Sequence, residues 1–156
     1  MLCLLIDTGL RITEALSLQR SKVDFENMLL TVMGKGNKER TIPMSLELRK
    51  VLCKWCDKHS HELVFSTRQG GRLGYDNTLR DFKNLAKRLG IEGVRVSPHT
   101  LRHTFAKSYV KSGGNLFYLM KALGHTTLAM SKRYVELDEQ DLKEMHVKTS
   151  IMNRLR

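Results

Sequence analysis

The sequence lacks a long hydrophobic run, a set of paired cysteines and an Asp-x-Asp motif. Its longest uninterrupted apolar stretch covers residues 1–6, whereas a membrane-spanning helix needs about 20 apolar residues. No basic segment precedes this stretch and no small-residue cleavage site follows it, so we expect a cytoplasmic protein without a membrane span. The three cysteines are an odd number and do not indicate a disulfide framework. Without an Asp-x-Asp pair, the sequence offers no obvious Mg²⁺ site.

The length and charge of the chain suggest one basic globular domain. Its 156 residues are enough for one domain with a core and too few for two. Lysine and arginine number 27 against 16 acidic residues, which gives a formal net charge of +11. A basic protein of this size commonly has a polyanionic partner, and DNA or RNA is the first candidate. The alternative is a soluble basic protein without such a partner, and charge alone does not distinguish an enzyme from a passive binding module.

Three short strands are predicted in the first third of the chain, at residues 23–25, 29–33 and 39–42. The first turn lies near residues 26–27. The second is a basic loop over residues 34–38, in which Gly34 and Gly36 allow a positive φ and therefore a sharp turn. These strands predict a small antiparallel sheet.

Most of the remaining sequence has helical periodicity, so the predicted fold class is mainly α with a small antiparallel β-sheet (α+β). The predicted helices are residues 1–19 with a break near 8–9, one from Ser45, one over the stripe Tyr75 to Leu89, one from Ser97 to about Lys111, one after Asn115, and one from about Thr127 that carries Tyr134. The expected buried positions on the second and third of these are Leu48, Val51, Leu52, Trp55, Cys56, Tyr75, Leu79, Phe82, Leu85, Ala86 and Leu89.

Four segments place cationic or nucleophilic side chains at a helix end or a loop tip. They read TGLRITE at residues 8–14, GKGNKER at 34–40, HTLRH at 99–103 and LGH at 123–125, the last followed by a tyrosine at position 134. The side chains that they supply for chemistry are Arg11, Lys35, His99, Arg102, His125 and Tyr134.

This combination of residue types suits phosphoryl transfer without a metal ion. Displacement at a phosphodiester builds negative charge on oxygen, and catalysis is mainly positioning and electrostatic stabilisation. The planar fork of arginine binds two phosphate oxygens at once and stays charged. A lysine or histidine can protonate a leaving alkoxide, and a tyrosine hydroxyl can attack phosphorus to form a covalent intermediate.

The local spacing favours the same interpretation. His99 and Arg102 are three residues apart, so on a helix they share a face and can reach one phosphate. Arg11 lies at a predicted helix break, where its side chain can point into a cleft. Glu14 follows three residues later, and a salt bridge would hold the guanidinium of Arg11 in place.

The four segments resemble the conserved motifs of the tyrosine recombinases, especially Xer-type recombinases and phage or transposon integrases. Residues 8–18 resemble the first arginine motif, residues 34–40 the β-hairpin lysine motif, and residues 98–106 the His-x-x-Arg box. Residues 123–125 followed by Tyr134 match the spacing of the last histidine and the nucleophile. All four occur in the family order and together cover nearly the whole chain, which makes the resemblance specific.

The resemblance implies a metal-free reaction in which Tyr134 attacks the scissile phosphate of double-stranded DNA. The product would be a 3′-phosphotyrosyl link and a free 5′-hydroxyl, with Arg11 and Arg102 binding the non-bridging oxygens. No cofactor is implied.

The same resemblance assigns roles to the other polar side chains of the motifs. Lys35 would be the general acid for the 5′-oxygen, His99 would assist in acid–base catalysis, and His125 would hydrogen-bond the phosphate. Glu14 and His103 are expected to support the site, the latter packed or hydrogen-bonded behind it. The remaining two basic residues of the hairpin segment are expected to be DNA-backbone contacts or surface charges: Lys38 and Arg40.

The resemblance also implies a domain organisation and an assembly. Residues 1–156 correspond to the catalytic domain, without the N-terminal core-binding domain and the first catalytic-domain helix. The amphipathic tail over residues 138–156 is expected to pack against a neighbouring protomer, because family members exchange a segment after the nucleophile. Self-association on DNA as a dimer or tetramer, association with the nucleoid, and no membrane or metal partner are therefore expected.

Two other functions and two other sites stay open at this point. A catalytically silent DNA-binding fragment and a type IB topoisomerase-like DNA-relaxing enzyme are the functional alternatives. The His99-x-x-x-His103 pair could bind Zn²⁺, but a glutamate beside the first histidine and an obvious third ligand are absent. Cys53 and Cys56, followed by His59 and His61, could form a redox or metal site, although Cys56 falls on the apolar stripe of a predicted helix.

Overall fold

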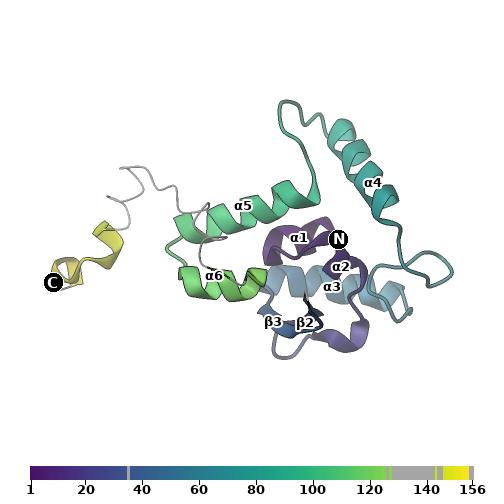
Figure 1. The fold of residues 1–156 in the computed structure, drawn as a ribbon, viewed down its shortest axis with the longest axis horizontal. Coiled ribbons are helices and arrows are strands. Elements are labelled where there is room, and N and C mark those ends of the chain that lie inside the picture. The colour runs from purple at the N-terminus through teal and green to yellow at the C-terminus, as the bar shows by residue number, and fades with distance from the viewer. Residues whose placement is uncertain (35, 126, 128–142, 144–145, 155–156) are drawn as a thin grey trace.

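The computed structural model describes residues 1–34, 36–125, 127, 143 and 146–154. Helices surround a small three-stranded antiparallel sheet in this part of the chain, which confirms the predicted fold class. The helices α1 (Leu2–Thr8) and α6 (Leu116–Leu123) lie above the sheet, and α4 (Tyr75–Arg88) stands apart from them (Figure 1). Within the described ranges, no helix has the length and apolar character needed to cross a membrane.

The sheet consists of β1 (Val23–Asp24), β2 (Leu29–Met33) and β3 (Glu39–Pro43), in that order. Its predicted positions are confirmed to within one residue. Side chains alternate between its two faces, and Leu30, Val32 and Ile42 are buried on one of them. Cross-strand pairing sets Leu30 opposite Ile42 and Val32 opposite Arg40. This register aligns Arg40 with the buried face, a point that matters for the site.

The predicted break in the first helix is present. Helix α1 (Leu2–Thr8) ends at Gly9, whose φ of 62° is left-handed, and α2 (Ile12–Leu16) follows after Arg11. A Cβ on Gly9 would collide with the ring of Phe105, so glycine permits both the turn and the close approach of α1 to the helix that carries Phe105.

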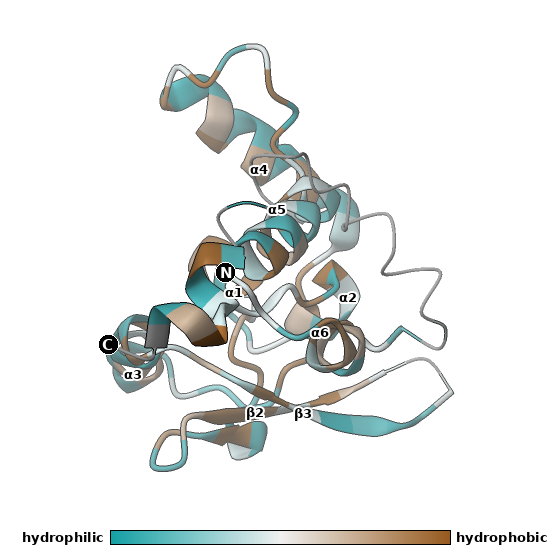
Figure 2. Ribbon diagram, turned by 90° about the vertical axis from the view of Figure 1, so that its left-hand side faces the viewer, coloured by the Kyte–Doolittle hydropathy of each residue, from teal (hydrophilic) through white to brown (hydrophobic). Residues whose placement is uncertain are grey.

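The serine and asparagine caps predicted for three helices are also present. The side chains of Ser45, Ser97 and Asn115 accept backbone hydrogen bonds at the starts of α3 (Leu46–Lys58), α5 (Pro98–Lys111) and α6 (Leu116–Leu123), respectively. Gly124 ends α6 in the left-handed conformation. The main core lies between α1, α2, α3 and the sheet, and a smaller one lies between α5 and α6. Figure 2 colours the apolar stretches of the chain brown.

The predicted apolar stripes on α3 and α4 (Tyr75–Arg88) were too wide. On α3, Leu48, Leu52 and Cys56 are buried, whereas Val51 and Trp55 are exposed. On and after α4, the exposed members of the stripe are Tyr75, Leu85 and Leu89. Helical periodicity identifies an apolar face, but the width that another element covers depends on tertiary packing.

The part of the tail that the structure describes is short. Residues 146–149 are helical and Ile151–Arg154 forms the 3-10 helix η2. Met152, which belongs to the tail that was expected to pack against a neighbouring protomer, is exposed. The helix predicted from about Thr127 falls mainly on residues 128–142, which include Tyr134 and lie outside the described residues.

Candidate active site

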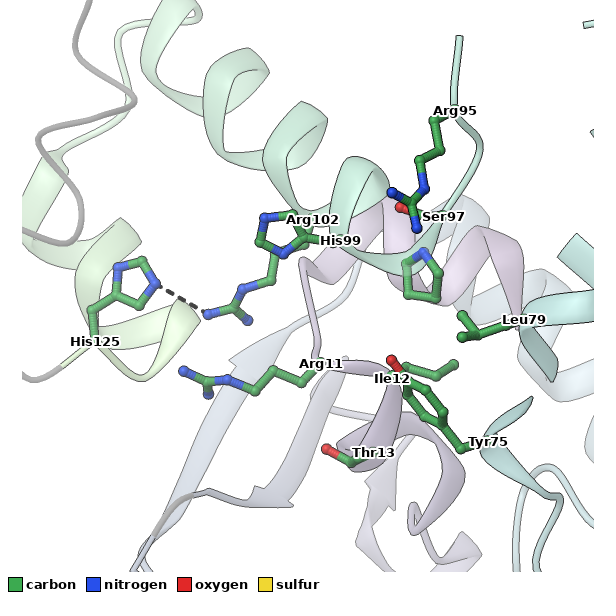
Figure 3. A pocket seen from close by; sticks show the side chains of 11 residues that line it. Arg11, Ile12, Thr13, Tyr75, Leu79, Arg95, Ser97, His99, Arg102 and His125 are labelled. Carbon is green, nitrogen blue, oxygen red and sulfur yellow. Dashed lines mark hydrogen bonds between the residues drawn. The ribbon is translucent and has the colours of Figure 1, made fainter. Parts of the chain in front are cut away.

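Four of the six predicted catalytic residues line one cleft of about 500 Å³. Its walls come from the start of α2, the start of α4, the first turns of α5 and the segment after α6, four regions that are far apart in the sequence. Figure 3 shows the guanidinium groups of Arg11 and Arg102 pointing toward the same side of the cleft as the ring of His125. The predicted catalytic residues that line the cleft are Arg11, His99, Arg102 and His125.

Arg11 lies immediately before α2, and Glu14 holds it at two points. The backbone N–H of Arg11 donates to Glu14 Oε2 at 2.8 Å, and Nη1 donates to Glu14 Oε1 at 3.1 Å. Nη1 also donates to the carbonyl oxygen of Leu123 at 3.3 Å. The side chain remains 35% exposed, so it is anchored at one edge and still open to the cleft. The predicted Arg11–Glu14 salt bridge is therefore confirmed.

Arg102 is buried in α5, and backbone carbonyl groups from two other elements hold it. Nη1 donates to Gly9 O and Nη2 donates to Leu123 O, both at 2.6 Å. Carbonyl oxygens fix the guanidinium without adding negative charge, so they leave its charge available to an anion in the cleft. Gly9 lies at the end of α1 and Leu123 at the end of α6, so Arg102 joins both helices to α5.

Two histidines flank this guanidinium. His99, on the first turn of α5, is exposed and lines the cleft. His125 follows Gly124, and its Nε2 lies 3.2 Å from Arg102 Nη2. Arginine can only donate, so Nε2 of His125 acts as the acceptor in this contact. His103 is half-buried and is not among the residues that line the cleft.

The structure corrects the prediction for Arg40. This residue was expected to be a DNA contact or a surface charge, but its side chain is only 9% exposed. Both terminal nitrogens donate to Glu14, Nη1 to Oε1 and Nη2 to Oε2, each at 2.8 Å, and Nε donates to Ala122 O at 2.9 Å. Lys38, in contrast, is exposed, and its role as a DNA contact stays a prediction.

Arg11 and Arg40 share the carboxylate of Glu14, a residue that is only 6% exposed. Burial by itself would raise the pKa of Glu14, but hydrogen bonds from Arg40 and Arg11 outweigh it and hold this pKa below the usual value. The carboxylate is therefore charged near neutral pH. We call Arg11, Arg40, Arg102 and Glu14 the arginine cluster.

Some of the predicted site cannot be located, and some of the cleft was not predicted. Lys35 and Tyr134 lie outside the described residues. Arg95 and Tyr75 line the cleft but were not predicted as site residues. Arg95 could have been predicted from its position two residues before Ser97, which caps α5. Because the start of α5 lies at the cleft, the residues just before it lie there as well.

The residues considered as an alternative redox or metal site, Cys56 and His59, are held in packing contacts instead. Cys56 is buried, and burial raises the pKa of its thiol. The ring of His59 stacks on Trp55 with centroids 3.8 Å apart, and Arg20 donates to the carbonyl oxygens of Cys56 and His59. In the described ranges, no three His, Cys, Asp or Glu residues are grouped as metal ligands would be.

Comparison with known proteins shows which family and fold this chain has. A model of the phage integrase family matches residues 1–141. Tyrosine recombinase XerC of Chlamydia muridarum is 33% identical over 154 residues, which cover 92% of this chain and 47% of XerC. The crystal structure of XerA recombinase superposes with a TM-score of 0.82 at 32% identity, covering 94% of this chain and 55% of XerA.

A XerH site-specific recombinase bound to a palindromic difH substrate, in a post-cleavage complex, has a TM-score of 0.79 at 25% identity. The match covers 94% of this chain and 44% of XerH. The chain thus spans about half the length of the recombinases that it matches. The order of the motifs, the cleft and the family match lead to one conclusion: this chain belongs to the phage integrase family, and its fold is that of the tyrosine recombinase catalytic domain.

Proposed function

We propose that this chain is the catalytic domain of a site-specific DNA recombinase or integrase. The observation that carries the proposal is the convergence of Arg11, Arg102, His99 and His125 on one cleft from separate elements. Backbone carbonyl groups accept hydrogen bonds from the buried guanidinium of Arg102 and fix its orientation. Such a cleft is suited to an anion with several oxygens.

The two arginines act on the phosphate. Their guanidinium groups bind the non-bridging oxygens and stabilise the charge that grows there as phosphorus becomes five-coordinate. Because Glu14 and the carbonyl groups fix the arginines before DNA binds, little reorganisation is needed during the reaction. His125, bonded to Arg102 through Nε2, is set to contact the same phosphate.

The covalent step is a displacement at phosphorus. The hydroxyl oxygen of Tyr134 forms the new bond to phosphorus, and the bond to the 5′-oxygen of the next nucleotide breaks. Lys35 supplies a proton to that leaving oxygen, and His99 assists in moving the tyrosine proton. Attack by a 5′-hydroxyl on the phosphotyrosine reverses the step and rejoins the strand without a cofactor.

We propose double-stranded DNA as the partner, bound by a protein that self-associates. The net charge of +11 favours a polyanion, and the similar XerH structure holds its DNA substrate. Pairing of two sites requires a dimer or tetramer, in which the tail over residues 138–156 packs against a neighbouring protomer. The protein would act in the cytoplasm, on the nucleoid.

Covalent trapping tests the proposed function. The chain is incubated with nicked duplexes that carry a randomised site, in the presence of a chelator, and adducts are resolved on a denaturing gel. We expect an adduct that the Tyr134→Phe variant does not form. Bound DNA without any adduct would support a silent DNA-binding module instead, and relaxation of any plasmid by the monomer would support a topoisomerase.

A further inference from the structure

Arg40 reaches from the sheet to Glu14 and Ala122, which neighbour the cleft residues Arg11 and His125 in the two elements that carry them. It lies on β3, paired with Val32 of β2, and points to the same side of the sheet as the buried Ile42. The partners of its guanidinium are distant in sequence: Glu14 is 26 residues away and Ala122 is 82 residues away. One side chain therefore joins the sheet to the start of α2 and to the end of α6.

Two glycines make room for this guanidinium. A Cβ on Gly34 would lie 3.1 Å from Arg40 Nη1, and a Cβ on Gly124 would lie 3.1 Å from both Cζ and Nη1. Both distances are shorter than ordinary van der Waals contact, so a larger residue at either position would displace the guanidinium. Gly124 immediately precedes His125, so the contact with Arg40 sits at the turn that directs His125 to the cleft.

The end of α6 is bound by all three arginines of the cluster. Ala122 O accepts from Arg40, and Leu123 O accepts from Arg11 and Arg102. The last carbonyl groups of a helix have no partners within the helix and carry a partial negative charge. Loss of Arg40 would thus leave one carbonyl without its donor and loosen the turn that leads to His125.

The sharing of Glu14 has an electrostatic consequence. Arg40 donates to both carboxylate oxygens in a fork, whereas the side chain of Arg11 donates to only one of them. A bidentate pair is the stronger arrangement, so Arg40 offsets most of the negative charge of the Glu14 carboxylate. Without Arg40, Glu14 would be free to pair fully with Arg11 and compete with a phosphate for it.

We infer that Arg40 is a positioning residue that holds Glu14 and the end of α6 so that Arg11 and His125 face the phosphate. This inference rests on the proposed function. Arg40 does not touch the DNA, because its side chain is nearly buried and Glu14 and Ala122 occupy its nitrogens. Its effect on the reaction passes mainly through Arg11, with which Glu14 would otherwise pair fully.

The test compares Arg40→Met with Arg20→Met. Arg20 also binds carbonyl groups at a helix end, those of Cys56 and His59 at the end of α3, but it does not line the cleft. Single-turnover cleavage is measured at saturating DNA, on the duplex identified by covalent trapping. Each protein is assayed with the ordinary scissile phosphate and with a methylphosphonate, which lacks the charged oxygen that Arg11 is proposed to bind.

We expect Arg40→Met to slow cleavage of the ordinary phosphate by about 100-fold, because small misplacements of a clamp have effects of this size. On the methylphosphonate it should cleave within about threefold of the parent, and Arg20→Met should stay within about threefold on both substrates. The ratio of the two rates does not depend on the fraction of folded protein. If Arg40→Met does not fold, Arg40→Lys replaces it, with an expected loss of about 10-fold, since lysine cannot form the fork.

The outcomes separate the inference from the function on which it rests. An equal loss on both substrates would mean that Arg40 does not act through Arg11, and no loss on the ordinary phosphate would mean that it positions neither Arg11 nor His125. Either result would overturn the inference while the parent still cleaves. Absence of cleavage by the parent on bound DNA would overturn the proposed function.

Discussion

The arginine cluster, through Arg11 and Arg102, and helix α4 line the same cleft but differ in how they are held. Each member of the cluster bonds to at least one other element or to Glu14, and the carboxylate, Arg40 and Arg102 are all nearly buried. Helix α4 buries Thr78, Phe82 and Ala86, while Leu85 and Leu89 on its flank remain exposed. Figure 1 shows α4 projecting beyond the other helices. The arginine side of the cleft is therefore held by many hydrogen bonds between distant elements, whereas the α4 side is held by a few buried side chains.

Removing a member of the cluster should have the largest effect. Arg102→Met deletes a proposed phosphate ligand and leaves the carbonyl groups of Gly9 and Leu123 without this donor. We expect the rate of covalent adduct formation to fall about 1000-fold, the size seen when one strong donor to a transition state is lost. Single-turnover trapping measures this, and a loss below about 10-fold would show that Arg102 does not contact the reacting phosphate.

Removing the shared charge should destabilise the fold in a pH-dependent way. Glu14→Gln leaves Arg11 and Arg40 without their carboxylate, which should lower the free energy of unfolding by about 3 kcal/mol near neutral pH. The pKa of Glu14 lies below its ordinary value of 4.5, so the folded state binds this proton less tightly than the unfolded state. The contribution of Glu14 is therefore present above about pH 4.5 and disappears as the pH falls through the lowered pKa.

Urea denaturation of the parent and Glu14→Gln at about pH 7 and about pH 3 measures this difference. The two proteins should differ less at the lower pH, because Glu14 of the unfolded parent, with its ordinary pKa of 4.5, is then largely protonated and the lowered pKa of the folded state no longer contributes its full stabilisation. A difference that stays constant would indicate that the charge of Glu14 does not contribute to stability.

Filling the space at the turn after α1 should have an intermediate effect. Gly9→Ala places a methyl group against Phe105 at a positive φ, so we expect a loss of about 2 to 3 kcal/mol in the free energy of unfolding. Gly90→Ala is the matched control, because Gly90 has a φ of 64° but open space around its Cβ position. It should lose only about 1 kcal/mol, and equal losses would show that the contact with Phe105 is unimportant.

The exposed side of α4 should be the least sensitive. Leu89→Ala removes a side chain that is 64% exposed, so the free energy of unfolding should change by less than about 0.5 kcal/mol. Phe82→Ala, on the buried side of the same helix, should lose about 3 kcal/mol. A large effect of Leu89→Ala, measured by urea denaturation, would mean that this side of α4 is covered in solution.

Local signals were enough to predict much of the fold. The helix break at Gly9 and the caps at Ser45, Ser97 and Asn115 depend on neighbouring residues only, and all are present. The Arg11–Glu14 salt bridge was predictable for the same reason. The cover over α4 was not, because an apolar stripe does not reveal how much of it another element buries.

The burial of Arg40 depended on distant residues. Its partners come from α2 and α6, and nothing near Arg40 in the sequence identifies them. Strand alternation was a usable signal, since Arg40 is two residues before the buried Ile42 and shares its face. The basic hairpin motif instead suggested that Arg40 is a DNA contact or a surface charge.

Locating the covalent adduct by mass spectrometry would show directly which residue is the nucleophile. The parent chain is trapped on nicked DNA in chelator, digested, and the DNA-linked peptide is identified. We expect a 3′-phosphate joined to Tyr134 and no adduct in the Tyr134→Phe variant. An adduct on another residue, or one that persists in Tyr134→Phe, would contradict it.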